Sequence, residues 1–376
     1  MLIPVGFAVV GGFLPNLPVA GPFGLILNTG LPWIVGAAGI GTGLAGLAVV
    51  LGGRKTSVLL VVGLVLLAGS GVIAYRFVSF AEQHGASYDV VRAVDGFPAI
   101  PQPDKNVTFA NVDGQDLHAD LWLPPAGPAS ETGGLPAVVF VHGGAFFGGG
   151  PGTRPLLMGA LRSAGIVAMD IEYRLSPPPR WNQAPGDVLC ALASLGSVDG
   201  LEGVDPSRVV VVGESAGGSL ALLAGYAAGT DHIASSCPGA GAPIVPAGVV
   251  AINPTADLAG IWADATIYEK PGERFPEAFI GGPPAQFPDR YAAASPFDLL
   301  RVDLPPTLLL QGEIDRLVLV QRTTELADRI RAAGSSVELV VAPFAGHGAD
   351  GEPNSFGDQV SQVIVRDFVL RVAPGA

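Results

Sequence analysis

The first 80 residues are almost continuously hydrophobic and contain no Asp or Glu. Two apolar runs, 31–53 and 57–75, are each long enough to cross a hydrocarbon core of about 30 Å as a helix. A buried helical hairpin is the alternative, although a soluble domain rarely has two such runs in succession. The pattern therefore predicts a transmembrane helical anchor with two clear spans.

Residues 2–26 form a third apolar region, interrupted by Pro4, Pro15, Pro18 and Pro22. They fit a third span, an interfacial segment or a re-entrant segment. A cleavable signal peptide is not expected, because a basic n-region is missing and further apolar runs follow.

The basic residues in this region predict its orientation. Arg54 and Lys55 link the two clear spans, and such loops favour the cytoplasmic side of a membrane. The polar remainder of the chain, one span further on, is then extracytoplasmic. Arg76, on the far side of the second span, argues weakly for the opposite orientation. The prediction is a multi-pass protein of the cell membrane.

From residue 106 onward, short apolar runs alternate with helical patterns, which is typical of a mostly parallel sheet flanked by helices. Residues 81–105 read as a linker, since three prolines stiffen its end. The sequence thus predicts three parts: an anchor over 1–80, a linker over 81–105 and an α/β domain over 106–376.

Ser215 lies in Gly213-Glu214-Ser215-Ala216-Gly217, between the apolar run 208–212 and the helical stretch 219–224. A serine nucleophile needs such a tight strand-to-helix turn, where small neighbours leave the hydroxyl accessible. The same turn places the N–H of Ala216 at a helix N-terminus, where it can donate to an oxyanion. An ordinary strand-to-helix turn is the alternative.

A second glycine-containing loop follows the buried run 137–141. The N–H groups of Gly143 and Gly144 are expected to complete an oxyanion hole with Ala216. His142 is expected to brace this loop by hydrogen bonding rather than to act as a base. A merely flexible glycine loop is the alternative, because three more glycines follow closely.

The catalytic acid and base are expected further along the chain. Asp315 comes just after the buried run 306–310, at the end of a strand where α/β sheets place catalytic groups. Glu313 is a competing acid in the same turn. His347 lies in a glycine-flanked loop after the final predicted strand, 337–341. The remaining histidines all precede Asp315: His84, His118, His142 and His232. The order Ser215, Asp315, His347 therefore predicts a Ser-His-Asp triad.

These motifs together resemble the α/β-hydrolase fold, and within it the hormone-sensitive-lipase-like and feruloyl-esterase-like carboxylesterases. The resemblance covers residues 106–372 and is carried by His142–Phe146, Asp170–Pro177, Gly213–Gly218, Asp315 and His347. Two residues depart from the family pattern. Ala145 replaces the third glycine of the lipase-like loop, which favours the feruloyl-esterase-like branch, and Glu214 replaces the more usual aspartate.

The resemblance implies a carboxylic ester hydrolase that works through an acyl-enzyme. Together with the predicted anchor, the sequence indicates a membrane-anchored hydrolase of short- to medium-chain acyl esters. Phe146 and Phe147, beside the oxyanion loop, and Glu214 are expected to bind substrate. The aromatic residues of the insertion 258–295 either line the same pocket or pack a satellite core.

Composition narrows the set of partners. The formal net charge of −13 arises entirely after residue 80, which argues against nucleic acid or an anionic membrane surface as a partner. A small-molecule or lipid ester fits instead. Neither a metal nor another cofactor is expected, since the sequence has no H-E-x-x-H motif and no cluster of Cys and His. Pairing of Cys190 with Cys237 stays open at this stage, as does the oligomeric state.

Four other functions are compatible with part of the pattern. The same triad could serve a peptidase or an acyltransferase. A catalytically silent hydrolase fold could act as an extracellular binding module, although such modules tend to lose a catalytic residue. A domain regulating a transporter is a poorer fit, because the apolar spans carry no intramembrane carboxylate.

Overall fold

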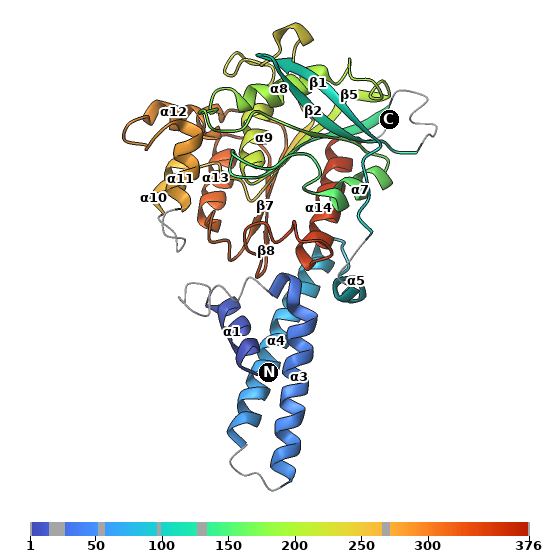
Figure 1. Ribbon diagram of the computed structural model, residues 1–376, viewed down its shortest axis with the longest axis vertical. Helices are drawn as coiled ribbons and strands as arrows, with labels where there is room; N and C mark the ends of the chain where they lie inside the picture. The colour runs from blue at the N-terminus through green and yellow to red at the C-terminus, as the bar shows by residue number, and fades with distance from the viewer. Residues whose placement is uncertain are drawn as a thin grey trace. The chain divides into compact units, whose positions relative to one another are not determined.

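The computed structural model describes residues 2–14, 27–51, 57–95, 99–125, 134–264 and 271–374. Contacts within the chain divide it into two compact units, and each is described by itself (Figure 1). The sheet unit comprises Ile100–Gln311, Arg316–Val341 and Val365–Ala376. The N-terminal unit comprises Met1–Ala99 together with two short segments from late in the chain, Gly312–Asp315 and Ala342–Ile364.

Eight strands in the described part of the chain form one sheet, in the order β1-β2-β4-β3-β5-β6-β7-β8. The first two pairings, β1 with β2 and β2 with β4, are antiparallel, whereas β4-β3-β5-β6-β7 is parallel throughout. The strands are β1 Lys105–Val112, β2 Gln115–Trp122, β3 Leu135–Val141, β4 Val167–Ile171, β5 Val204–Glu214, β6 Gly248–Ile252, β7 Thr307–Gly312 and β8 Val337–Ala342.

The central strands are continuous apolar runs because helices cover both of their faces. All four valines of 209–212 in β5 are fully buried. On one face, α8, α9 and α13 share a single hydrophobic core with the sheet, and α7 and the C-terminal part of α14 lie on the other (Figure 1). These helices are α7 Pro155–Ser163, α8 Ala184–Ser194, α9 Ala216–Ala227, α13 Val320–Ala332 and α14 Phe356–Val372. The insertion between β6 and β7 adds α10 Leu258–Ala263, α11 Pro271–Ile280 and α12 Pro288–Ala293.

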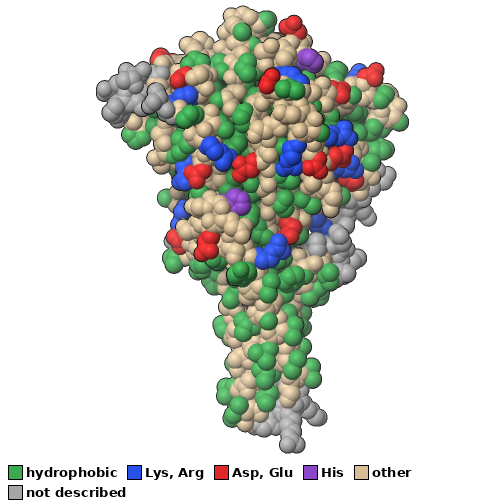
Figure 2. Space-filling model, turned by 180° about the vertical axis from the view of Figure 1, so that it is seen from behind, with side chains coloured by type: hydrophobic (Ala, Val, Ile, Leu, Met, Phe, Trp, Pro, Cys, Tyr) green, Lys and Arg blue, Asp and Glu red, His purple; other side chains and the backbone are tan. Residues whose placement is uncertain are grey.

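The N-terminal unit contains α1 Leu2–Phe13, α3 Leu27–Val50, α4 Ser57–Gln83 and α5 Val90–Asp95. Two stretches, Pro32–Val50 in α3 and the whole of α4, are long and apolar enough to cross a membrane. Only 22% of the apolar window in each is buried within the structure, so most of their apolar side chains face outward. Figure 2 shows this hydrophobic surface along the helices. The possible third span, 2–26, is described only as far as residue 14, and Arg54 and Lys55 also lie outside the described residues.

A disulfide bond joins a helix and a loop of the sheet unit. Cys190 in α8 is joined to Cys237, which lies in a loop after α9, with Cα atoms 5.3 Å apart. The bond encloses a loop of 47 residues along the chain. It settles the pairing that the sequence alone left open.

Loss of this bond is expected to destabilise the sheet unit. A crosslink that closes a loop of this size restricts the unfolded chain, so replacing both cysteines by alanine should lower the free energy of unfolding by about 2–4 kcal/mol. Thermal unfolding of the oxidised wild type, the reduced wild type and the double variant would measure this effect. The reduced protein should resemble the double variant, and equal melting temperatures for all three would contradict the prediction.

Candidate active site

Ser215 stands at the junction between β5 and α9 in a strained backbone conformation. Its φ is 53° and its ψ is −117°, a combination that exposes a side chain at the tip of a sharp turn. Two glycines make this turn possible. A Cβ atom at Gly217 would lie 2.1 Å from the carbonyl oxygen of Val141, and one at Gly213 would lie 2.1 Å from that of Gly217. The turn therefore has the geometry of a nucleophile elbow.

The loop after β3 lies directly against this elbow. A Cβ atom built on Gly143 would be 3.3 Å from the Cβ of Ser215, so the loop backbone passes beside the serine. Gly144 has a φ of 118°, and its carbonyl accepts hydrogen bonds from the N–H groups of Phe147 and Gly148. Within the described residues, no backbone carbonyl accepts from the N–H groups of Gly143, Gly144 or Ala216. These are the donors that the sequence predicts for an oxyanion hole.

His142 contacts and stabilises the same loop. Its Nδ1 lies 2.6 Å from the carbonyl oxygen of Gly143, and its ring stacks on Tyr173 with centroids 4.4 Å apart. The Tyr173 hydroxyl in turn donates to the His142 carbonyl at 3.2 Å. Burial lowers the pKa of His142, which keeps the ring neutral. These contacts match the bracing role expected for His142.

The second part of the site joins Asp315 to His347. The two residues follow β7 and β8, and a carboxylate oxygen of Asp315 lies 2.8 Å from Nδ1 of His347. The Asp315 side chain is fully buried, whereas the His347 side chain is 21% exposed. A backbone hydrogen bond from Ile314 to Ala345 connects the two turns. Because Nδ1 is held by the carboxylate, Nε2 is the nitrogen left for proton transfer.

The carboxylate of Glu313, the competing acid in the same turn, has other partners. One of its oxygens pairs with Arg76 at 2.9 Å, and the other accepts from the N–H of Phe344 at 3.0 Å. The structure thus brings Asp315 to the histidine and uses Glu313 elsewhere. The long-range partner Arg76 is a feature that the sequence did not reveal, since it lies 237 positions away from Glu313.

The predicted functional residues fall into two groups. Ser215, Gly143, Gly144 and Ala216 belong to the sheet unit, whereas the Asp315–His347 pair belongs to the N-terminal unit. Within each unit, the residues of the group lie close together. Their union into one triad remains a prediction.

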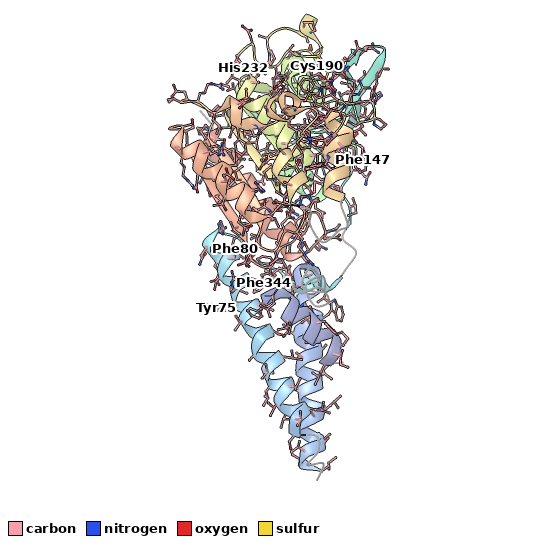
Figure 3. All side chains as sticks on the ribbon, turned by 90° about the vertical axis from the view of Figure 1, so that its left-hand side faces the viewer. Tyr75, Phe80, Phe147, Cys190, His232 and Phe344 are labelled. Carbon is pink, nitrogen blue, oxygen red and sulfur yellow. A yellow bond between two sulfur atoms is a disulfide. The ribbon has the colours of Figure 1, made fainter. Side chains whose placement is uncertain are left out.

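The three residues expected to bind substrate have different environments. Phe146 is 1% exposed and stacks on Phe279 of the insertion with ring centroids 3.8 Å apart, so it fills the core. Phe147 is 56% exposed and is the freer of the two rings (Figure 3). Glu214 forms an ion pair with Arg154 at 3.0 Å. Arg154 was not predicted; the only sequence signal is an arginine that directly follows a glycine-rich loop, and its burial is known only from the structure.

The buried aromatic residues of the insertion pack into the main hydrophobic core of the sheet unit, and not into a separate satellite core. Each of Phe275, Phe279 and Tyr291 is at most 4% exposed. Trp262 donates its indole N–H to Glu277 at 2.9 Å. Tyr268 lies outside the described residues. The sequence left open whether these aromatic residues line the substrate pocket or pack in a core. The described side chains favour packing. No group of three or more His, Cys, Asp or Glu side chains suited to a metal ion occurs among the described residues.

Asp170 in β4 is a fully buried carboxyl group near the oxyanion loop. One of its oxygens accepts from the N–H of Gly152 at 2.7 Å, and the other has no hydrogen-bond partner in the described part of the protein. Burial raises the pKa of Asp170 from 3.8 to about 8. The folded protein therefore keeps a proton on Asp170 that the unfolded chain releases.

This retained proton predicts a pH-dependent stability. Between pH 4 and 8 the unfolded state loses the proton and the folded state does not, so the free energy of unfolding falls as pH rises, by at most about 1.4 kcal/mol per pH unit. The Asp170→Asn variant should lose this dependence and should gain stability relative to wild type at pH 8. Melting temperatures at pH 5 and pH 8 would test it, with the exposed Asp231→Asn as the control. Parallel pH dependences for wild type and Asp170→Asn would contradict the assignment.

The strand order, the elbow at Ser215 and the adjacent glycine loop define a protein of the α/β-hydrolase fold. Solved structures agree on the fold. Esterase 2 from Thermogutta terrifontis aligns with a TM-score of 0.56 and 23% identity, over 74% of this chain and 95% of that chain. A bacterial heroin esterase aligns with a TM-score of 0.56 and 24% identity, over 72% and 84% respectively.

The family is defined by sequence. Residues 120–330, more than half of the chain, match the BD-FAE family model, and the chain belongs to this family. Esterase LipC of Mycobacterium tuberculosis is 30% identical over 61% of this chain and 56% of its own length. The probable carboxylic ester hydrolase LipM of the same organism is 28% identical over 63% and 54%. The chain thus spans about half the length of these curated relatives.

Proposed function

We propose that this protein is a serine hydrolase of carboxylic esters in which Ser215, His347 and Asp315 form the catalytic triad. The observation that carries the proposal is Ser215 in a strained elbow, beside backbone N–H groups that donate to no backbone carbonyl among the residues that the structure describes. The Asp315–His347 hydrogen bond supports it, because this pair has the orientation that a general base requires. Membership of the BD-FAE family and the names of the relatives agree with ester hydrolysis.

The roles follow from this geometry. Nε2 of His347 takes the proton of the Ser215 hydroxyl while the serine oxygen attacks the acyl carbon. Asp315 holds the imidazole in the required tautomer and stabilises its protonated form. Gly143, Gly144 and Ala216 donate to the oxyanion of the tetrahedral intermediate. The imidazolium then protonates the leaving alkoxide, and water activated by His347 releases the acid from the acyl-enzyme.

The hydrolase is further proposed to be anchored in the cell membrane by α3 and α4. The support is the outward-facing apolar surface of these helices, which includes Leu47 at 55% and Val65 at 65% exposure. Such a continuous apolar surface is costly in water and is covered by lipid in a membrane. An extracytoplasmic hydrolase fits both the predicted charge distribution and the Cys190–Cys237 disulfide, which persists in oxidising compartments.

Activity measurements on the full-length protein in detergent would test the proposal. Hydrolysis of p-nitrophenyl esters should be measured across a series of acyl lengths, beginning with short chains because esterase 2 of Thermogutta terrifontis was solved with propionate and butyrate. A fluorophosphonate probe should label the protein, and peptide mapping should find the label on Ser215. Absence of both hydrolysis and labelling would reject the proposal in favour of a silent binding module.

A further inference from the structure

The apolar N-terminal helices contact the loop that leads to His347. Phe344, three positions before the histidine, is only 1% exposed. Its ring makes edge-to-face contacts with the ring of Phe77 in α4 and the ring of Phe13 in α1. The ring centroids are 6.0 Å and 5.6 Å apart, respectively. Figure 3 shows Phe344 beside the end of α4 that carries Tyr75 and Phe80. The histidine loop is therefore packed on α1 and on α4, one of the two helices proposed to anchor the protein.

The carboxylate of Glu313 connects three segments at this place. It lies two positions before Asp315, pairs with Arg76 of α4 and accepts the backbone N–H of Phe344. The guanidinium of Arg76 also lies 4.8 Å from the centre of the Phe344 ring. One carboxylate thus joins the helix, the turn that carries the aspartate and the loop that carries the histidine.

The segment after His347 is held by the same region. Phe77 stacks on Phe356, the first residue of α14, with ring centroids 4.0 Å apart and an angle of 4° between the planes. Asp89, just beyond α4, exchanges two backbone-to-side-chain hydrogen bonds with Gln359, at 2.8 and 3.1 Å. The histidine loop is therefore fixed to the N-terminal region on both sides.

We propose that Arg76, Phe77 and Glu313 are positioning residues for the Asp315–His347 pair, so that the apolar helices are part of the catalytic apparatus as well as a membrane anchor. The inference rests on the proposed function. An isolated ion pair with side chains 42% and 34% exposed contributes little by itself. Here the pair acts on a pre-aligned hydrogen bond between two loops, where a displacement of about 1 Å can cost up to about a hundredfold in rate.

Three variants of the full-length protein in detergent test the inference: Arg76→Ala, Glu313→Ala and the double variant. Each single variant should lower kcat by about tenfold with little change in KM, because the reacting groups and not the substrate contacts are displaced. The kcat of the double variant should be close to that of Glu313→Ala, since both residues act through the same ion pair. Arg76→Lys, which keeps the charge, should recover part of the loss. Hydrogen exchange in 312–316 and 342–349 should accelerate in the impaired variants.

Arg371→Ala is a matched control. Arg371 also pairs with a glutamate, Glu338, and also lies over a phenylalanine ring, Phe368 at 5.4 Å, on elements that carry no proposed catalytic residue. It should keep the wild-type kcat and exchange pattern. Wild-type kcat and exchange in Arg76→Ala, or strictly additive losses in the double variant, would overturn the inference. An inactive wild-type protein would instead overturn the proposed function, and the exchange data would still decide whether α4 holds the two turns.

Discussion

Replacement of Ser215 by alanine is expected to lower kcat for p-nitrophenyl ester hydrolysis by about 10⁴- to 10⁶-fold. In the proposed mechanism the hydroxyl is the attacking group, and a triad without its nucleophile loses nearly all catalysis beyond that of the oxyanion donors and substrate binding. The effect should fall on kcat rather than KM, because alanine leaves the pocket almost unchanged. Steady-state kinetics with the purified full-length protein would measure it.

The control for this variant is Ser163→Ala. Ser163 is exposed at the end of α7, where its hydroxyl donates to the carbonyl of Gly159. This variant should retain the wild-type rate and fluorophosphonate labelling, whereas Ser215→Ala should lose both. Residual activity in Ser215→Ala above about a hundredth of wild type would mean that another nucleophile carries the reaction.

The Asp315→Asn variant is expected to lose about 10⁴-fold in kcat. An asparagine amide in this position presents an N–H or a poorer acceptor to Nδ1 of His347 and favours the wrong tautomer, while the size of the side chain is preserved. Kinetics should again show the loss in kcat. Because the Asp315 side chain is fully buried, its replacement could also affect folding. The melting temperature of the Asp315→Asn protein should therefore be measured in parallel, to separate misfolding from lost catalysis.

Asp328→Asn serves as the matched control for Asp315. Asp328 lies on α13, is exposed, and pairs with Arg331 one turn away on the same helix. Its removal should change the rate by less than about twofold, as is usual for a surface pair. A folded Asp315→Asn protein with nearly normal kcat would assign the orientation of His347 to another group.

The ion pair of Arg76 also bears on the predicted orientation in the membrane. In the sequence, Arg76 argues weakly against the predicted extracytoplasmic orientation, because it follows the second predicted span. The structure gives this residue a specific partner, Glu313, and a ring to cover, Phe344. These contacts give Arg76 a structural role within the N-terminal unit.

Much of the fold and of the proposed site was predictable because the relevant signals are local. The elbow at Ser215 requires a strand, two glycines and a helix within a short stretch, and each leaves a mark in the sequence. The Gly143–Gly144 loop follows a buried strand in the same way. The apolar helices are visible from composition alone. Chain order then predicted that His347 is the base, since every other histidine precedes the acid.

The sequence by itself determined the alternation of strands and helices, the serine turn, the glycine loop and the apolar N-terminal region, because backbone sterics and hydrophobic periodicity act between near neighbours. Only the tertiary structure decided which acid of the turn meets the histidine, that Phe146 is buried while Phe147 is exposed, that Cys190 pairs with Cys237, and that Arg76 contacts Glu313. Each of these depends on distances between groups far apart in the chain or on the direction of one side chain. Such quantities are fixed by packing and leave no local trace in the sequence.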